Sequence, residues 1–152
     1  MIDAHRPLYA SLKRHAVDYI VIGGIAAIVH GVPRMTLDID LLIRATPENA
    51  KALLDALLDA GLGTAAMLDA EELLAHEITV FRDRLRVDVQ TSSPGIRFEE
   101  VRPRALMLHI EDVEVPILAA ADLLAAKEAC NRPKDQQDLE ALRQILGKSD
   151  VT

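Results

Sequence analysis

The sequence predicts an α/β (α+β) fold in which a single domain spans residues 1–152. Two observations lead to this fold class. Short apolar runs with strand character, such as the one from Tyr19 to Ile22, alternate with segments of helical periodicity in the first two thirds of the chain. The last third, over residues 118–147, has helical periodicity, and we expect it to form a pair of helices packed on the domain.

The composition indicates an aliphatic core. A chain of 152 residues has about the length of one domain, and it can bury most of the surface that its unfolded form exposes. Half of the residues are apolar, but only two Phe and two Tyr are present and Trp is absent. We therefore expect one core built of Leu, Ile, Val and Ala.

Charge and hydropathy exclude several classes of protein. The formal net charge of −7 argues against a surface built throughout to hold nucleic acid, because phosphate binding depends on clustered Lys and Arg. The segment from Arg82 to Arg104 is mildly basic, and either a solvated mixed-charge surface or a local binding patch fits it. No apolar run approaches the ~20 residues of a membrane span, and the N-terminus does not resemble a secretory signal. We expect a cytoplasmic protein with no membrane partner.

The chain opens with a predicted helix, a strand and a second helix. The first helix is expected over about residues 3–16, and the apolar strand runs from Tyr19 to Ile22. Gly23 and Gly24 then permit a tight turn and a close approach to a ligand. They lead into a short helix over residues 25–30, whose N-terminal amides favour an anion such as a phosphate.

A second strand after the loop at residues 31–36 carries two acids, Asp38 and Asp40. Side chains two residues apart in a strand point to the same face, so both carboxylates can converge on one hard cation or on a pair of cations. The apolar residues between and after them point into the core. Two like charges so close together require compensation, and a metal ion is the simplest form of it.

The middle and end of the chain add further helices, strands and a hairpin. In chain order, these are a helix from Thr46-Pro47 to Gly61, a short helix over Leu68–Ala75, strands over Glu77–Phe81 and Leu85–Thr91, a hairpin of Leu106–Ile110 and Val113–Ile117, and helices over Ala119–Asn131 and Lys134–Leu146, the last ending at Gly147. Alternation in the fourth strand places Asp88 on a polar face. Asp88 can supply a third carboxylate, although a solvent-facing edge strand gives the same pattern.

Several of these residues occur in an order that resembles a known superfamily. The motifs are GGIAAIVHGVPRMTLDID from Gly23 to Asp40, the acid Asp88 on a later strand, and K-x4-R-x-K-D-x2-D from Lys127 to Asp138. Together they resemble the nucleotidyltransferase superfamily, and most closely its small bacterial AbiEii-like group, which is similar to the nucleotidyltransferase toxins of toxin–antitoxin pairs. The resemblance covers most of the chain.

The resemblance implies a mixed β-sheet flanked by helices and a Mg²⁺-dependent transfer of a nucleoside monophosphate from a nucleoside triphosphate such as ATP to an acceptor hydroxyl. Asp38, Asp40 and Asp88 would be the catalytic residues and would hold one or two Mg²⁺ ions. The residues implied to bind the nucleotide are Gly23, Gly24, Arg34, Thr36, Lys127, Lys134 and Asp138. Many family members have Gly-Ser where this chain has its glycine pair.

Two other functions stay open from the sequence. The fold could serve as a catalytically silent nucleotide- or partner-binding module, similar to an antitoxin, or the acids could form only a solvated face of a structural domain. Retention of all three acids favours the enzyme. The acceptor could be an RNA end such as that of tRNA, a protein or a small molecule, and a cognate toxin or antitoxin could be a partner. The short chain leaves little room for an acceptor domain, which would fit a homodimer.

Overall fold

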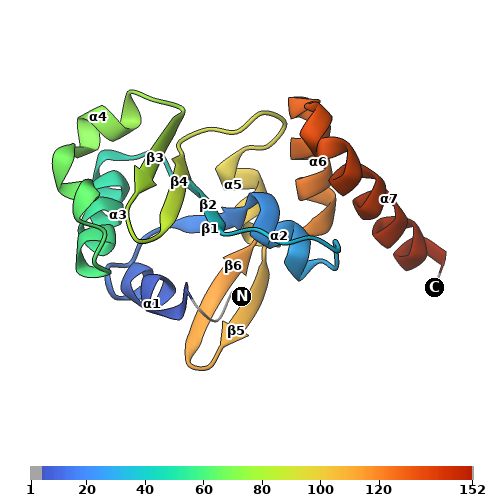
Figure 1. Cartoon of the computed structure of the whole chain (residues 1–152), viewed down its shortest axis with the longest axis horizontal. Helices are drawn as coiled ribbons and strands as arrows, with labels where there is room; N and C mark the ends of the chain where they lie inside the picture. Colours follow the sequence, from blue (N-terminus) through green and yellow to red (C-terminus); the bar gives the residue numbers. More distant parts are fainter. Residues whose placement is uncertain (1–4, 152) are drawn as a thin grey trace.

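A six-stranded mixed sheet forms the centre of the computed structural model (Figure 1), which describes the backbone of residues 5–151 and the side chains of residues 5–147. The strands are β1 (Tyr19–Ile22), β2 (Asp38–Ile43), β3 (Ile78–Arg82), β4 (Arg86–Gln90), β5 (Leu106–Ile110) and β6 (Val113–Ile117), arranged in the order β3-β4-β2-β1-β6-β5. Strand β2 pairs in parallel with β4, and β1 with β6, whereas the other three pairs are antiparallel. The expected mixed sheet flanked by helices is confirmed.

Seven α-helices surround the sheet in the described part of the chain. They are α1 (Arg6–Arg14), α2 (Gly23–Val29), α3 (Pro47–Asp59), α4 (Ala70–Leu74), α5 (Phe98–Val101), α6 (Ala120–Cys130) and α7 (Gln136–Val151), with short 3-10 turns at η2 (Gly63–Met67), η3 (Arg102–Arg104) and η4 (Pro133–Asp135). Figure 1 shows α1, α3 and α4 grouped at one end of the molecule and α6 and α7 at the other. None of these helices is long and apolar enough to span a membrane.

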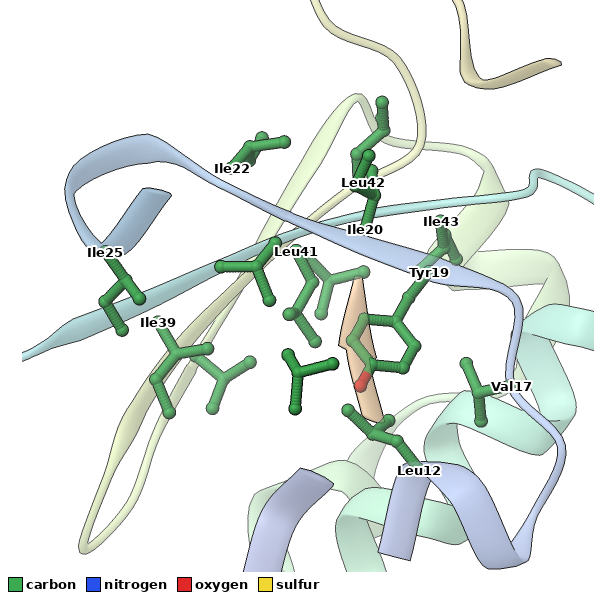
Figure 2. Close-up of a cluster of buried hydrophobic side chains, with 14 of the residues drawn as sticks. Leu12, Val17, Tyr19, Ile20, Ile22, Ile25, Ile39, Leu41, Leu42 and Ile43 are labelled. Atoms are coloured by element: carbon green, nitrogen blue, oxygen red, sulfur yellow. The ribbon is translucent and has the colours of Figure 1, made fainter. Parts of the chain in front are cut away.

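The core is aliphatic, as the composition predicts, and β1 and β2 cross its centre. All four residues of β1 are buried, and so are Ile39, Leu41 and Ile43 on one face of β2. Figure 2 shows Leu12 and Val17 beside Tyr19 in the same cluster as these β2 side chains. Burial of one full face of β2 fixes which of its residues point the other way, and Asp38 and Asp40 are among those.

The predicted helix starts depend on local caps that the structure contains. The Thr46 hydroxyl accepts a hydrogen bond from the Asn49 amide at 3.2 Å, and Pro47 follows as the first residue of α3.

Strands β1, β5 and β6 have the predicted bounds, and β3 and β4 lie within one residue of theirs. Patterns confined to a few neighbouring residues are therefore sufficient for these elements.

Several predicted bounds were wrong. Helix α2 begins at the glycines instead of after them, and α3 stops at Asp59, two residues before Gly61. Of the predicted opening helix over residues 3–16, residues 3 and 4 lie outside the described part, and the described helix begins at Arg6.

Two corrections concern the end of the chain. Lys134 and Asp135 belong to the 3-10 turn η4 and not to the last helix, because Pro133 opens a separate turn. Helix α7 continues past Gly147 to Val151. Gly147 is not among the residues with a positive φ, so it does not adopt the left-handed conformation by which a glycine ends a helix.

Candidate active site

Strands β2 and β4 place three carboxylates and one arginine on the same face of the sheet. In their parallel pairing Asp40 lies opposite Asp88, and Asp38 lies opposite Arg86. Cross-strand partners share a face, as do residues two apart in one strand. The alternation that predicted one polar face for each strand therefore brings these four side chains together.

The four side chains line a cavity of about 250 Å³. Its lining residues are Gly23, Gly24, Arg34, Thr36, Asp38, Asp40, Ile78, Arg86, Asp88, Gln90, Lys127, Arg132, Lys134 and Asp135. The cavity thus joins the glycine pair, the two strands and the segment around η4. Every residue that the sequence singled out for the site lines this cavity except Asp138.

Asp40 lies at the back of the cavity against the glycine pair. Gly23 has φ +68, and a Cβ atom placed there would lie 2.2 Å from Asp40 Oδ2, so only a residue without a side chain fits. The Gly24 amide donates a hydrogen bond to the Asp40 carboxylate. The structure therefore gives one of the two amides expected near a phosphate a carboxylate as its partner, and its contact with phosphate stays a prediction.

Burial and the neighbouring charges of Asp88 and Asp38 raise the pKa of Asp40 to about 6, although the Gly24 amide acts in the opposite direction. Asp40 and Asp88 are also hydrogen-bonded to each other, which favours one shared proton. A cation bound between them would replace that proton. Asp40 thus senses the charge of Asp38, its predicted neighbour on the same strand, and that of Asp88 on the adjacent strand.

Arg86 supplies part of that compensation. Its Nε donates to Asp88 Oδ1 at 3.1 Å and its Nη2 donates to Asp88 Oδ2 at 3.3 Å, while Nε lies 3.8 Å from Asp38 Oδ2. These contacts, first those with Asp88 and then the charge of Asp38, raise the pKa of Arg86. From the sequence, this arginine belongs to a mildly basic segment that fits either a solvated mixed-charge surface or a local binding patch. Its spacing of two from Asp88 on an alternating strand is the signal that could have placed it in the site.

Thr36 organises the entry to β2. Its hydroxyl accepts a hydrogen bond from the Asp38 amide at 3.3 Å, and its Cγ2 would lie 3.1 Å from a Cβ atom added to Gly24. The glycine pair and the R-x-T-x-D-x-D segment therefore pack directly on each other. This contact explains why small residues and a short hydroxylated residue occur together in the motif.

A second group of charges forms part of the cavity wall, and Asp138 lies behind this group. Lys127 Nζ lies 2.9 Å from Asp138 Oδ2 and 3.4 Å from Asp135 Oδ1, and all three side chains are almost fully buried. Arg34 Nη1 reaches Asp138 Oδ2 at 2.6 Å, and Arg132 Nε reaches Asp135 Oδ2 at 2.7 Å. Each acid therefore has two cations. Asp138 holds Lys127 and Arg34 in place and does not itself face the cavity.

The pKa of Asp135 shows how complete this pairing is. Burial alone would raise the pKa of Asp135, but the hydrogen bond from Arg132 and the charge of Lys127 outweigh burial and lower it. Lys134 differs from the other basic residues of this segment, because it is exposed and forms no ion pair among the described side chains. It remains available to an anion in the cavity.

The donor set of the cavity fits a hard cation such as Mg²⁺, which prefers carboxylate oxygens. Asp40 and Asp88 already converge, and Asp38 lies on the same face. Within the described residues, however, no three His, Cys, Asp or Glu side chains are close enough together to form a ready metal site. Arg86, in contact with Asp38 and Asp88, lies among the acids instead.

A second cavity of about 200 Å³ adjoins the first and shares Gly23, Ile78, Gln90, Lys127 and Arg132 with it. Its remaining wall is more apolar and comes from the end of β1, the loop after β4 and helix α6. A molecule seated on the acids could therefore extend into this second space.

Comparisons with known proteins follow the same geometry. A family model described as "Nucleotidyltransferase of unknown function (DUF6036)" matches residues 5–151. Among solved structures, the fold is similar to that of a "putative nucleotidyltransferase (TM1012) from Thermotoga maritima", with a TM-score of 0.51, 16% sequence identity, and coverage of 97% of this chain and 92% of that chain. At this identity the likeness concerns the fold. A comparison with curated protein sequences gave no match.

Proposed function

Because this chain belongs to the nucleotidyltransferase family DUF6036, we propose that it moves a nucleoside monophosphate from a nucleoside triphosphate to an acceptor hydroxyl, with Mg²⁺ as cofactor and in the cytoplasm. The observation that carries the proposal is the single cavity in which Asp38, Asp40 and Asp88 meet the glycine pair and the basic segment at Lys127 and Lys134. Acids that suit a cation and basic residues that suit a phosphate chain line one space, and nucleotidyl transfer needs both.

The acids and the basic residues of the cavity have separate roles in this proposal. Asp38, Asp40 and Asp88 would hold the metal, which when bound supplies positive charge to the transferring phosphoryl group. Asp88 is also the carboxylate that we propose to accept the proton of the acceptor hydroxyl. Because Asp40 titrates with a pKa of about 6, we expect metal binding to strengthen as pH rises through this value.

The basic residues of the cavity would hold the phosphates. Lys134 is free to contact them, while Lys127 and Arg34 are positioned by buried acids and add positive charge at the cavity. Thr36 and the glycines shape the floor on which the nucleotide would lie. The adjoining apolar cavity gives room for a base or for the end of the acceptor.

The AbiEii-like subtype and a role in a toxin–antitoxin pair belong to the same proposal. They are supported by the motif from Gly23 to Asp40 and by the segment from Lys127 to Asp138. We propose an RNA end, a protein or a small molecule as acceptor, and a cognate partner or a second copy of the chain as the source of acceptor contacts.

The first test is isothermal titration with ATP, GTP, CTP and UTP, with and without Mg²⁺, on the wild type and on Asp38→Asn/Asp40→Asn. We expect at least one nucleotide to bind in a metal-dependent manner and the double variant to lose at least about tenfold in affinity, since two ligands of a hard cation are gone. Asp55→Asn/Glu71→Gln is the charge-matched control, because both residues lie outside the cavity.

A second step separates an enzyme from a silent binding module. The nucleotide that binds, labelled at its α-phosphate, is incubated with cellular RNA and protein fractions, and the enzyme predicts transfer of the label that depends on Asp88. Failure of all four nucleotides to bind to the folded protein in Mg²⁺ would refute the transferase and leave a partner-binding module as the better hypothesis.

A further inference from the structure

Arg86 occupies the position in which a cation would have to contact the acids. It lies opposite Asp38 in the neighbouring strand and two residues before Asp88 on the same face. Its guanidinium contacts both oxygens of Asp88, at 3.1 and 3.3 Å, and lies 3.8 Å from Asp38. Both oxygens of Asp88 and one oxygen of Asp38, two of the three proposed metal ligands, are therefore already engaged by a side chain of the protein.

The contacts of Arg86 are of a kind that can be exchanged. Its side chain is 39% exposed, that of Asp38 is 42% exposed and that of Asp88 is 15% exposed. Water reaches the arginine and competes for it, which weakens the longer pair with Asp38 most. The backbone pairing of β2 with β4 extends over five residue pairs and does not involve the Arg86 side chain. The guanidinium can therefore change partners while the two strands stay paired.

Two other basic residues of the cavity, Lys127 and Arg132, are held differently. Lys127 is buried between Asp135 and Asp138, and Arg132 is tied to Asp135 by two hydrogen bonds. These side chains have their own acids and cannot neutralise β2 and β4 without giving those acids up. Arg86 is the arginine that contacts the strand carboxylates in the described structure.

We propose that Arg86 is an exchangeable counter-cation: it neutralises Asp38 and Asp88 in the empty site, and it leaves them for the phosphates when a divalent cation and a nucleotide enter together. This inference rests on the proposed function. Its consequence is that Arg86 opposes binding of the metal alone and favours binding of the metal with its nucleotide, so that each ligand increases the affinity for the other.

The test is the affinity for Mn²⁺ alone, followed by electron paramagnetic resonance of the free ion, in the wild type and in Arg86→Gln. The glutamine variant removes the competing charge, and we expect it to bind Mn²⁺ roughly five- to tenfold more tightly than the wild type. Arg82→Gln is the matched control. Arg82 lies opposite Arg86 in the pairing of β3 with β4 but forms no ion pair among the described side chains. The Mn²⁺ affinity of Arg82→Gln is therefore expected to stay within about twofold of wild type.

The nucleotide provides the second readout. In the wild type we expect the nucleotide identified by titration to bind at least about fivefold more tightly with Mn²⁺ than without, and we expect this ratio to fall in Arg86→Gln. Arg86→Lys keeps the charge without the two-pronged contact and should resemble the wild type more than the glutamine variant does. Circular dichroism establishes that each variant is folded, and Arg86→Met, which also removes the charge, replaces Arg86→Gln if the glutamine variant is not folded.

Two outcomes would overturn the inference. Mn²⁺ affinity that is equal to or weaker than wild type in folded Arg86→Gln shows that the arginine does not compete, while the proposed function stands because metal still binds. Absence of Mn²⁺ binding in both the wild type and Arg86→Gln overturns the inference and the metal dependence of the proposed function together.

Discussion

The two charged regions around the cavity differ in how completely their acids are paired with cations. In the region around η4, Asp135 and Asp138 each contact two cations and are almost fully buried. On the sheet, three acids share one partly exposed arginine, and the pKa of Asp40 is raised to about 6. The first region is complete without a ligand, whereas the second lacks positive charge. This difference indicates that the first region supports the fold and that the second region binds a ligand.

The largest effect is expected where the complete region is broken. Replacing Lys127 with Met should lower the free energy of unfolding by about 3–5 kcal/mol, because it removes one cation from each of two buried acids. Urea unfolding followed by circular dichroism measures the change. Lys51→Met removes an exposed pair with Asp55 and should cost less than about 0.5 kcal/mol. A Lys127 variant within about 1 kcal/mol of wild type would show that this network does not support the fold.

A smaller effect of opposite sign is expected in the incomplete region. The pKa of Asp40 is raised to about 6 in the folded protein from its ordinary value of 3.8, so the folded state favours the protonated carboxyl. Stability due to this group is present below about pH 4 and is lost as pH rises to 6. Asp40→Asn stays neutral, and at pH 8 it should be more stable than wild type by about 2–3 kcal/mol.

Urea unfolding in EDTA at pH 3.5 and pH 8 measures this difference, and the two proteins should be nearly equal at the lower pH, where the Asp40 carboxyl is protonated in the folded state and largely protonated in the unfolded state. Asp55→Asn is the control, since its carboxylate lies on the surface of α3 and pairs with Lys51 there. Equal stability of wild type and Asp40→Asn at both pH values would mean that the acids of the sheet are already compensated.

The smallest effect concerns the glycine pair. Gly23→Ala should cost about 1–2 kcal/mol for the left-handed backbone, and it should push Asp40 aside and weaken Mn²⁺ binding. Gly24→Ala has no positive φ and needs only a small shift of Thr36, so its cost should be lower. Urea unfolding and metal titration of both variants test the order. If Gly24→Ala costs more than Gly23→Ala, close packing on Thr36 matters more than the backbone conformation.

The sequence was sufficient for the acids and insufficient for their partners. Alternation within one strand is a local property, and it placed Asp38, Asp40 and Asp88 on polar faces without knowledge of the sheet. The position of Arg86 opposite Asp38 depends on the register between two strands, which local patterns do not specify. The ion pair of Arg34 with Asp138 joins residues 104 positions apart and depends on how α7 packs.

The short elements were missed for a related reason. Helix α5 has four residues and η3 has three, so neither is long enough to show a helical period. The bounds of α7 failed because Gly147 was expected to end the helix, and a glycine does so only when its backbone turns left-handed. Of the site residues that the sequence predicts, only Asp138 falls outside the cavity, since a motif shows that residues act together and not which of them faces the ligand.

The register between β2 and β4 also determines how a substitution can abolish ligand binding from a distance. If β4 slipped by one residue, Val87 and Val89, which are fully buried, would turn into the cavity, and Asp88 would enter the core. Burial of the hydrophobic face therefore fixes the strand register, and with it the positions of the acids on the opposite face. Substitutions at Ile39 or Val87 that loosen this face can abolish ligand binding without contacting the ligand, and a screen for inactive variants should recover them beside those at the carboxylates.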